Sequence, residues 1–538
     1  MNNLNILFLL RLWPVYGGGE TVTICLANEM VKRGHKVSVA YFKDNVKEQM
    51  PFIDDRINAI RIDGVDCDEL YMDGTASKQT CALACKSVVE IVRNRRIDTI
   101  IDQWWPSEFI STLKAECPEV KIIKCHHSAD LSIDNIKRIL PCVDRYVFPS
   151  LVAQRKYETM AHYDNHDGKL DSIPNPNLYT SEQCIFPHDA DIVLPIEKIA
   201  DRWERLISHI GINTGSSLPA YSCCELEDKT ISVVIPSYGR AHLIEQTIPS
   251  FLQEGVSELI VVDDCSQDNT TEVIANMQKK YPQIKYFRNP QNMRQPASNN
   301  RGIEQVHGDY IYFGDDDSIL TPGSIRALKQ TLEYYDVGAV MARPLYAGSN
   351  YKPRFHDKYM RWITARGKVT SSAEIYDVSS LTGNWRGYLP YPIEVPYMHA
   401  CALVRTELAR QCMFDTNYQG CAYREETDFF FRLSLDFGAK LMYDARAVQF
   451  NLPDYMVRST GARTGGYETW KRSAIECNNY FLDKNWDNIA AHYGLTVTKD
   501  EIRQSFEQSL RPPHTNPLKK VLKDIYFFLL YHTPFIQN

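Results

Sequence analysis

The sequence has no excess of basic residues, no long apolar run and no zinc-knuckle cysteine spacing. Its 60 lysine and arginine residues are outnumbered by 67 acidic ones, so no broad positive surface is available for nucleic acid. No window of about 18 apolar residues occurs, and the amino terminus lacks a basic start and cleavage site, so we expect neither a membrane span nor a secretory leader. The 15 cysteines form no Cys-x-x-Cys pair, which predicts reduced thiols in the cytoplasm.

The composition is that of an ordinary folded protein. Hydrophobic residues make up 44% and charged residues 24% of the 538 positions, which excludes a disordered or fibrous class. A chain of this length exceeds one ordinary core, so we expect several domains of unequal size.

The amino-terminal part reads as a βαβ unit with a glycine loop. A strand over 5–10 is followed by Gly17-Gly-Gly-Glu, a helix over 20–33 and a second strand over 36–42. Further apolar runs at helix-length spacing predict a parallel sheet, and we assign residues 1–180 to one Rossmann-like domain. Residues 181–229 have no sustained strand pattern, so we expect them to form a connector with one amphipathic helix over 196–210.

A second βαβ pattern starts abruptly at residue 231. Strands are expected over 231–235, 258–262, 284–288 and 310–313, with helices between them. We therefore predict an α/β chain with two doubly wound domains, the second over 230–455, followed by a helical extension over 456–538.

Acidic residues follow two of these strands. Asp264 follows the second strand and the run Asp315-Asp316-Asp317 follows the fourth. Ligands of open parallel sheets bind beyond the carboxyl ends of the strands, and hard oxygen ligands suit Mg²⁺ or Mn²⁺. A solvated acidic turn is the alternative, but the position of the run after a Tyr-Ile-Tyr-Phe strand favours a site for a metal and a diphosphate.

Four ordered motifs carry a family resemblance: Ser232-Val-Val-Ile-Pro-Ser-Tyr, Val261-Val-Asp-Asp-Cys-Ser-Gln-Asp-Asn-Thr, Gly308-Asp-Tyr-Ile-Tyr-Phe-Gly-Asp-Asp-Asp and Arg424-Glu-Glu-Thr-Asp-Phe-Phe-Phe-Arg. Together they resemble family 2 inverting glycosyltransferases of the GT-A fold. The resemblance implies metal-dependent transfer of a sugar, of hexosyltransferase type, from a nucleotide diphosphate-sugar to an acceptor hydroxyl. The expected pathway is synthesis of surface polysaccharide or glycoconjugate.

The resemblance also implies roles for individual residues. The donor nucleotide is expected to contact Pro236, Ser237, Tyr238, Arg240, Asp264 and Asp316. The metal ligands are expected to be Asp315 and Asp317, and Asn300 and Gly302 match an Asn-x-Gly helix start beneath the pocket.

Glu426 stands at the family's general-base position, where Asp is usual. Asp428 is a second candidate for the base and Glu425 a candidate for acceptor binding, although all three also suit the amino terminus of a helix. Many relatives carry a metal-binding His where this chain has Asn451. His399 precedes this region in an apolar run, and we interpret it as a core residue.

An aromatic loop precedes His399. Trp385, Arg386, Tyr388 and Tyr391 suit either stacking on a sugar ring or packing beneath a loop.

The first domain has weaker motifs of its own. Its glycine loop, Lys124-Cys-His-His, Arg145-Tyr-Val-Phe-Pro-Ser and Ile173-Pro-Asn-Pro-Asn are similar to the amino-terminal half of a GT-B glycosyltransferase, whose donor-binding half is absent here. We therefore expect this domain to be catalytically incomplete and to serve acceptor binding or assembly. The alternatives are a transferase with two active sites and a non-catalytic sugar-binding or nucleotide-binding scaffold.

The carboxyl-terminal tail combines Lys519, Lys520 and Lys523 with the apolar run 525–531. It suits either peripheral contact with an anionic membrane, at its inner face, or a terminal helix docked on the body. The expected partners are thus a nucleotide-sugar, a glycan or lipid-linked glycan acceptor, and a membrane surface.

Overall fold

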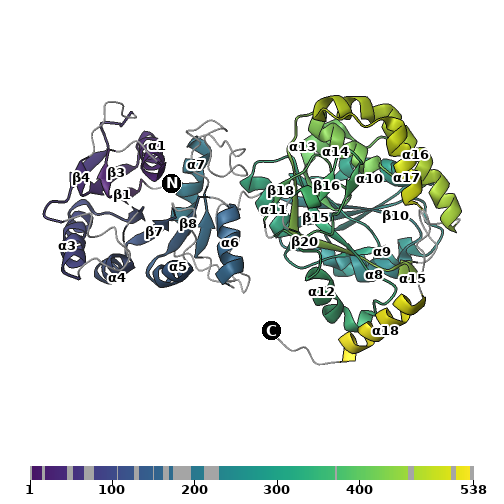
Figure 1. The fold of residues 1–538 in the computed structure, drawn as a ribbon, viewed down its shortest axis with the longest axis horizontal. Helices are drawn as coiled ribbons and strands as arrows, with labels where there is room; N and C mark the ends of the chain where they lie inside the picture. The colour runs from purple at the N-terminus through teal and green to yellow at the C-terminus, as the bar shows by residue number, and fades with distance from the viewer. Residues whose placement is uncertain are drawn as a thin grey trace. The chain divides into compact units, whose positions relative to one another are not determined.

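The chain forms two compact units, Met1–Glu227 and Asp228–Asn538, in the computed structural model (Figure 1). The structure describes residues 3–14, 18–44, 52–65, 78–103, 105, 107–126, 133–149, 151–161, 169–173, 196–210, 229–369, 372–389, 391–457, 466–510 and 517–532. Gly17 and the run 174–177 of the predicted first-domain motifs lie outside these ranges. None of the helices in these ranges is long and apolar enough to cross a membrane.

The first unit is built on a seven-stranded parallel sheet of order β5-β3-β1-β6-β7-β8-β9. Its strands are β1 (Asn5–Leu9), β3 (Lys36–Tyr41), β5 (Asn58–Arg61), β6 (Thr99–Asp102), β7 (Lys121–Cys125), β8 (Arg145–Phe148) and β9 (Leu170–Ser172). The central strands are buried on both faces because helices cover the sheet, as in other doubly wound folds. The predicted Rossmann-like sheet is confirmed.

The helices of the first unit are α1 (Gly18–Lys32), α3 (Lys78–Arg95), α4 (Ser107–Glu116), α5 (Ile133–Ile139), α6 (Leu151–Ala161) and α7 (Ile196–His209). The amphipathic helix predicted over 196–210 is present as α7. It is joined to the end of α1 by an ion pair from Arg33 to Asp201 at 2.6 Å and by a contact of 2.7 Å between His35 and Glu204. This part of the predicted connector therefore packs on the first unit.

The second unit is built on a nine-stranded mixed sheet of order β12-β11-β10-β13-β19-β15-β20-β14, with β18 also paired to β20. The strands are β10 (Ile231–Ser237), β11 (Val256–Asp263), β12 (Ile284–Arg288), β13 (Tyr310–Phe313), β14 (Ser318–Leu320), β15 (Ala339–Tyr346), β18 (Ile393–Glu394), β19 (Ala402–Arg405) and β20 (Leu441–Asn451). The first four strands in sequence are parallel, at the predicted places. The α/β class is confirmed.

The other half of this sheet runs in both directions, which the sequence did not predict. The chain leaves β15 and enters β19 at the same edge of the sheet, so β19 is antiparallel to both β13 and β15. Helix α14 (Glu425–Leu435) then runs from the edge where the parallel strands end to the opposite edge of the sheet. Strand β20 begins there and is parallel to β15. As a result the amino terminus of α14 lies at the edge where the parallel strands end.

The other helices of this unit are α8 (Ala241–Thr247), α9 (Thr270–Lys280), α10 (Arg294–Gln305), α11 (Ser324–Tyr334), α12 (His356–Thr364), α13 (Thr406–Cys412), α15 (Asp454–Val457), α16 (Gly466–Tyr493), α17 (Lys499–Ser509) and α18 (Pro517–His532). The last three form the predicted helical tail, which is confirmed (Figure 1).

Helix α10 packs very closely on strand β10. A Cβ atom built on Gly302 would lie 2.3 Å from Cγ1 of Val234, nearer than any real contact allows. Asn300, on the same helix, fixes the loop after α13 by bonding both the amide and the carbonyl group of Phe414. The Asn-x-Gly pair thus sets the position of α10 beneath the ends of the parallel strands.

Replacing Gly302 by Ala is expected to lower the stability of the second unit. An alanine in a helix normally gains roughly 0.5–1 kcal/mol over glycine, but overpacking against Val234 costs about 1–3 kcal/mol. Calorimetry of the full chain should therefore show a lower midpoint for one unfolding transition. An unchanged or higher midpoint would mean that α10 can move away from the sheet.

Candidate active site

One cavity of about 520 Å³ lies at the carboxyl ends of β10, β11 and β13. Parallel strands end at the same edge, so residues far apart in sequence meet there. The cavity is lined by Pro236, Ser237, Tyr238, Arg240, Asp264, Asn292, Arg294, Gln295, Ser298, Asp315, Asp316, Asp317, Gly420, Cys421 and Ala422. All eight residues predicted to bind the donor nucleotide or the metal are among them.

The acidic triplet faces one buried arginine. Nε of Arg240 lies 3.5 Å from Oδ1 of Asp316, and Nη2 lies 3.7 Å from Oδ2 of Asp317. The same guanidinium donates a hydrogen bond of 2.6 Å to the carbonyl oxygen of Val457. Arg240, predicted to contact the nucleotide, is thus also the cation nearest to the triplet.

The arginine does not balance all three carboxylates. Burial raises the pKa of Asp316 to about 7, with Arg240 opposing the rise and Asp317 adding to it. Burial also raises the pKa of Asp315 well above its usual range, and the charges of Asp317 and Glu426 add to this rise. A second cation at this place would relieve the repulsion, so the residues fit a divalent metal.

The protein supplies only part of a complete metal site. In the described ranges no group of three or more His, Cys, Asp or Glu side chains could hold a metal ion. Mg²⁺ in proteins is usually held by one or two carboxylates together with waters and substrate phosphates. The pair Asp315 and Asp317 has the composition of such a site.

Asp264 holds the loop that borders the cavity. Its Oδ1 accepts hydrogen bonds from the side-chain amide of Asn289 and the backbone amide of Met293, and its Oδ2 accepts one from the amide of Arg294. The carboxylate lines the cavity and keeps acceptor capacity on Oδ2 for a ligand N–H group. The expected nucleotide contact is therefore geometrically available beside a structural role that the sequence did not indicate.

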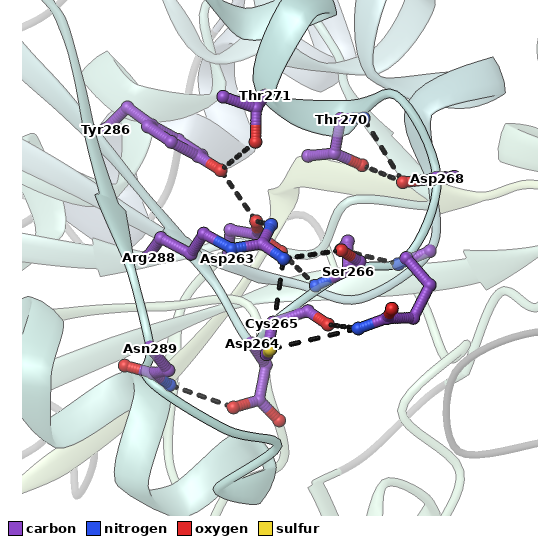
Figure 2. Close-up of polar contacts among 12 residues, drawn as sticks. Asp263, Asp264, Cys265, Ser266, Asp268, Thr270, Thr271, Tyr286, Arg288 and Asn289 are labelled. Carbon is purple, nitrogen blue, oxygen red and sulfur yellow. Dashed lines mark hydrogen bonds and ion pairs between the residues drawn. The ribbon is translucent and has the colours of Figure 1, made fainter.

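The neighbouring Asp263, the last residue of β11, holds the turn after this strand against β12 (Figure 2). The sequence predicted no role for it. It is fully buried and accepts bonds of 2.6 Å from the Tyr286 hydroxyl and 2.5 Å from Nη1 of Arg288. The amide of Ser266 donates a third bond of 2.9 Å. An aspartate bonding the backbone amide three residues later is a common turn signal, and the Asp-Asp-Cys-Ser run could have revealed it.

A second, small cavity lies beside the first and contains Glu426 from the first turn of α14. Asp315 lines both cavities and so links the donor side to Glu426. Nδ1 of His399 lies 3.7 Å from Oε2 of Glu426, and the imidazole is partly exposed. The interpretation of His399 as a core residue therefore needs correction, because it stands next to the candidate base.

The other two acidic residues of α14 lie outside both cavities. Asp428 is fully buried and is bound by Arg432 at 2.8 Å, Lys484 at 2.9 Å and Asn485 at 2.7 Å, which corrects its assignment as a possible base. Glu425 is also buried, and burial raises its pKa well above the usual range, with Glu426 adding to the rise. Neither residue lines either of these two cavities.

Asn451 lies next to the triplet through sheet pairing. It is opposite Ser318 in β14, directly after Asp317, and opposite Tyr346 in β15. Two residues earlier, the Gln449 amide donates a bond of 2.8 Å to Oδ2 of Asp315. Side chains alternate along a strand, so Asn451 belongs to the same face of β20 as Gln449.

The aromatic loop divides into packing and exposed parts. Trp385 is buried against Tyr397 and Tyr443, which favours the packing interpretation for this residue. Arg386 is exposed and lies 5.0 Å above the ring of Tyr346, the last residue of β15. Tyr346 is opposite Asn451 in the sheet, so Arg386 lies over the neighbour of Asn451.

In the first unit, Lys124 of the predicted Lys-Cys-His-His motif is buried. It donates a hydrogen bond of 2.6 Å to the buried Asp102 and another of 3.1 Å to the carbonyl oxygen of Trp105. Such a pair holds the ends of β6 and β7 together. The GT-B-like character of this unit stays a prediction.

Known proteins resemble parts of this chain. A GalNAc(5)-diNAcBac-PP-undecaprenol beta-1,3-glucosyltransferase of Campylobacter jejuni is 38% identical over 103 residues, which are 19% of this chain and 33% of that protein. An uncharacterized glycosyltransferase of Haemophilus influenzae is 37% identical over 92 residues, 17% of this chain and 37% of that protein. The chain thus spans well under half the length of either relative.

Among solved structures, the mannosyltransferase PcManGT from Pyrobaculum calidifontis in complex with GDP-Man and Mn²⁺ is 14% identical, with a TM-score of 0.35, over 57% of this chain and 82% of that one. S. aureus TarS 1–349 in complex with UDP-GlcNAc is 15% identical, with a TM-score of 0.33, over 51% of this chain and 77% of that one.

The family model described as glycosyl transferase family 2 matches residues 232–393, which include strands β10 to β13 and the acidic triplet. With the α/β sheet around the cavity, this match confirms the predicted GT-A fold class. Residues 232–393 of this chain are therefore a glycosyl transferase family 2 domain.

Proposed function

We propose that the second unit transfers a sugar from a nucleotide diphosphate-sugar to an acceptor hydroxyl, with inversion at the sugar carbon. The observation that carries this proposal is the acidic triplet Asp315, Asp316 and Asp317, with Arg240 beside Asp316 and Asp317, at a cavity of about 520 Å³ lined by residues of the family 2 match. A cavity of this size suits a nucleotide-sized ligand, and the excess negative charge suits a metal that bridges to phosphate.

The donor would lie across the ends of β10 and β11. Asp264 would accept a hydrogen bond from an N–H group of the base, which favours uracil, thymine or guanine. Asp316 would face the ribose, and Pro236, Ser237 and Tyr238 would line the nucleotide. Asp315 and Asp317 would hold Mg²⁺ or Mn²⁺, which supplies charge neutralisation for the departing diphosphate.

Glu426 would accept the proton of the attacking hydroxyl. It lines the small cavity that shares Asp315 with the main cavity, and an acceptor hydroxyl beside it would attack the sugar carbon from the side opposite to the leaving group. His399, within 3.7 Å of the Glu426 carboxylate, would hold it in position. General-base assistance of this kind is typically worth about 10²–10⁴-fold in rate.

The biological setting follows from the relatives. The Campylobacter jejuni relative is named for an undecaprenol diphosphate-linked glycan, so we propose a growing glycan, carried by a lipid or free, as the acceptor class and polysaccharide or glycoconjugate synthesis as the pathway. The first unit would bind the acceptor without catalysing transfer itself. A cytoplasmic location stays a prediction.

The first test is Asp317→Ala. Loss of a metal ligand should remove several kcal/mol of charge stabilisation, a decrease in kcat/KM of about 10²-fold or more, with unchanged thermal stability. Transfer and hydrolysis of a panel of nucleotide-sugars with Mn²⁺ measure this. Asp436→Ala, an exposed acid at the end of α14, is the matched control. Full activity of Asp317→Ala would instead support a second active site in the first unit.

The second test separates Glu426 from Asp428. Glu426→Gln should lower kcat by about 10²–10⁴-fold while the nucleotide still binds and the melting temperature is unchanged. Asp428→Asn should instead lower the melting temperature, because it removes the fully buried carboxylate that pairs with both Arg432 and Lys484. A fully active Glu426→Gln variant would remove the proposed base.

The third test introduces the usual histidine. Asn451→His would place an imidazole on the face of β20 that already contacts Asp315, so Mn²⁺ should bind more tightly in the presence of a nucleoside diphosphate. Titration followed by electron paramagnetic resonance measures the change. Asn417→His, at an exposed loop position, controls for a histidine added elsewhere. Equal affinity in both variants would show that position 451 does not reach the metal.

A further inference from the structure

Helix α18 carries apolar side chains on two opposite faces. Phe527 and Tyr531, one turn apart, are 4% and 2% exposed and face the body of the second unit. The other face repeats at helical spacing and remains open: Leu522 is 58%, Ile525 51%, Tyr526 44% and Leu529 52% exposed, and Phe528 beside them is 62% exposed. A docked terminal helix needs only one apolar face, so the second one requires another explanation.

The buried face fixes the helix firmly. The ring of Phe527 lies 4.8 Å from Trp362 and 5.7 Å from Tyr359, both on α12. The ring of Tyr531 stacks on that of Phe355 at 4.7 Å, and Lys358 donates a hydrogen bond of 2.8 Å to the carbonyl oxygen of Tyr531. The open stripe is therefore presented in a fixed direction, as a surface of the folded unit, with α18 beside α12 (Figure 1).

Basic residues border this open face. Arg366 lies 4.4 Å above the ring of Trp362, which in turn contacts Tyr526, and Lys352 lies 6.0 Å from the ring of Tyr531. Further exposed basic residues on the same elements are Arg354, Arg361, Lys368 and Lys523. The nearby acids are Asp357 and Asp524, and Asp524 accepts a hydrogen bond of 2.6 Å from Asn350.

The sign of this border is opposite to that of the chain, whose net charge is −7. An apolar stripe flanked by lysine and arginine is the composition of a helix that lies in a membrane interface. Basic residues near an anionic bilayer each contribute to binding and are screened by salt. A hydrophobic protein partner would explain the stripe but not the positive border.

We propose that the open face of α18, bordered by the basic residues of α12 and its flanking loops, docks on an anionic membrane surface. The chain would lie on the bilayer without crossing it. The opposite, buried face of α18, with Phe527 and Tyr531, belongs to the same apolar cluster as Phe450 and Leu452, which flank Asn451. Docking would therefore hold the edge of the second unit that carries the acidic triplet close to the lipid surface. The proposal does not depend on the transfer reaction.

The test is co-sedimentation of the full-length protein with vesicles of phosphatidylglycerol and phosphatidylcholine, compared with phosphatidylcholine alone. The wild type should pellet with the anionic vesicles and lose binding as salt is raised. Leu522→Gln combined with Ile525→Gln should weaken binding by at least about tenfold, because it removes apolar area at the centre of the stripe. Lys523→Glu should weaken binding mainly at low salt.

The matched control is Leu83→Gln, which changes a leucine of similar exposure, 47%, on helix α3 of the first unit. It should bind vesicles like the wild type. Unchanged melting temperatures exclude unfolding as the cause of any loss. Wild type that does not pellet with anionic vesicles, or a double variant that binds equally well, would overturn the proposal. So would a stripe variant that changes only self-association, measured by analytical ultracentrifugation without lipid.

Discussion

The site depends on an imbalance of charge, because Arg240 pairs with Asp316 and Asp317 while a third carboxylate, Asp315, lies beside them. Burial and mutual repulsion raise the pKa of Asp315 and Asp316, so the protein alone holds this cluster at a cost. Arg240 is in turn fixed by the carbonyl oxygen of Val457, which ties the end of β10 to the segment after β20. The same imbalance would favour a metal with its diphosphate.

Asp315 connects the two halves of the site. It lines the main cavity and the small cavity with Glu426, and Gln449 of β20 holds one of its oxygens. Tyr312 donates a hydrogen bond of 2.7 Å to the oxygen of that same amide, so the orientation of Gln449 is determined from both sides. The antiparallel insertion of β19 matters here, since it lets α14 return with Glu426 at the edge where the parallel strands end.

The carboxyl-terminal helix shows how one segment can satisfy two interpretations. Its buried face packs on α12, as expected of a docked terminal helix, and its open face keeps the composition expected of a membrane contact. The two faces are possible together because an α-helix separates residues three or four apart from those in between. The buried face of α18 shares one apolar cluster with Phe450 and Leu452 of the second unit, so the open face is held in a fixed position on that unit.

The sequence by itself determined the central parallel strands of both sheets, the helical tail and eight of the residues that line the cavity. These features depend on local periodicity and on the rule that parallel strands end at one edge, so Asp264 and Asp315 could be assigned without coordinates. Only the tertiary structure separated Glu426, which lines a cavity, from Asp428, which is buried and paired, although the two are two residues apart on one helix. It also showed that His399 lies beside Glu426, that Asp263 bonds Tyr286 and Arg288, and that Gln449 bonds Asp315. The reason is physical: which partners a side chain meets depends on strand order and helix crossing, and the order of β19, β15 and β20 is set by contacts between segments far apart in the chain.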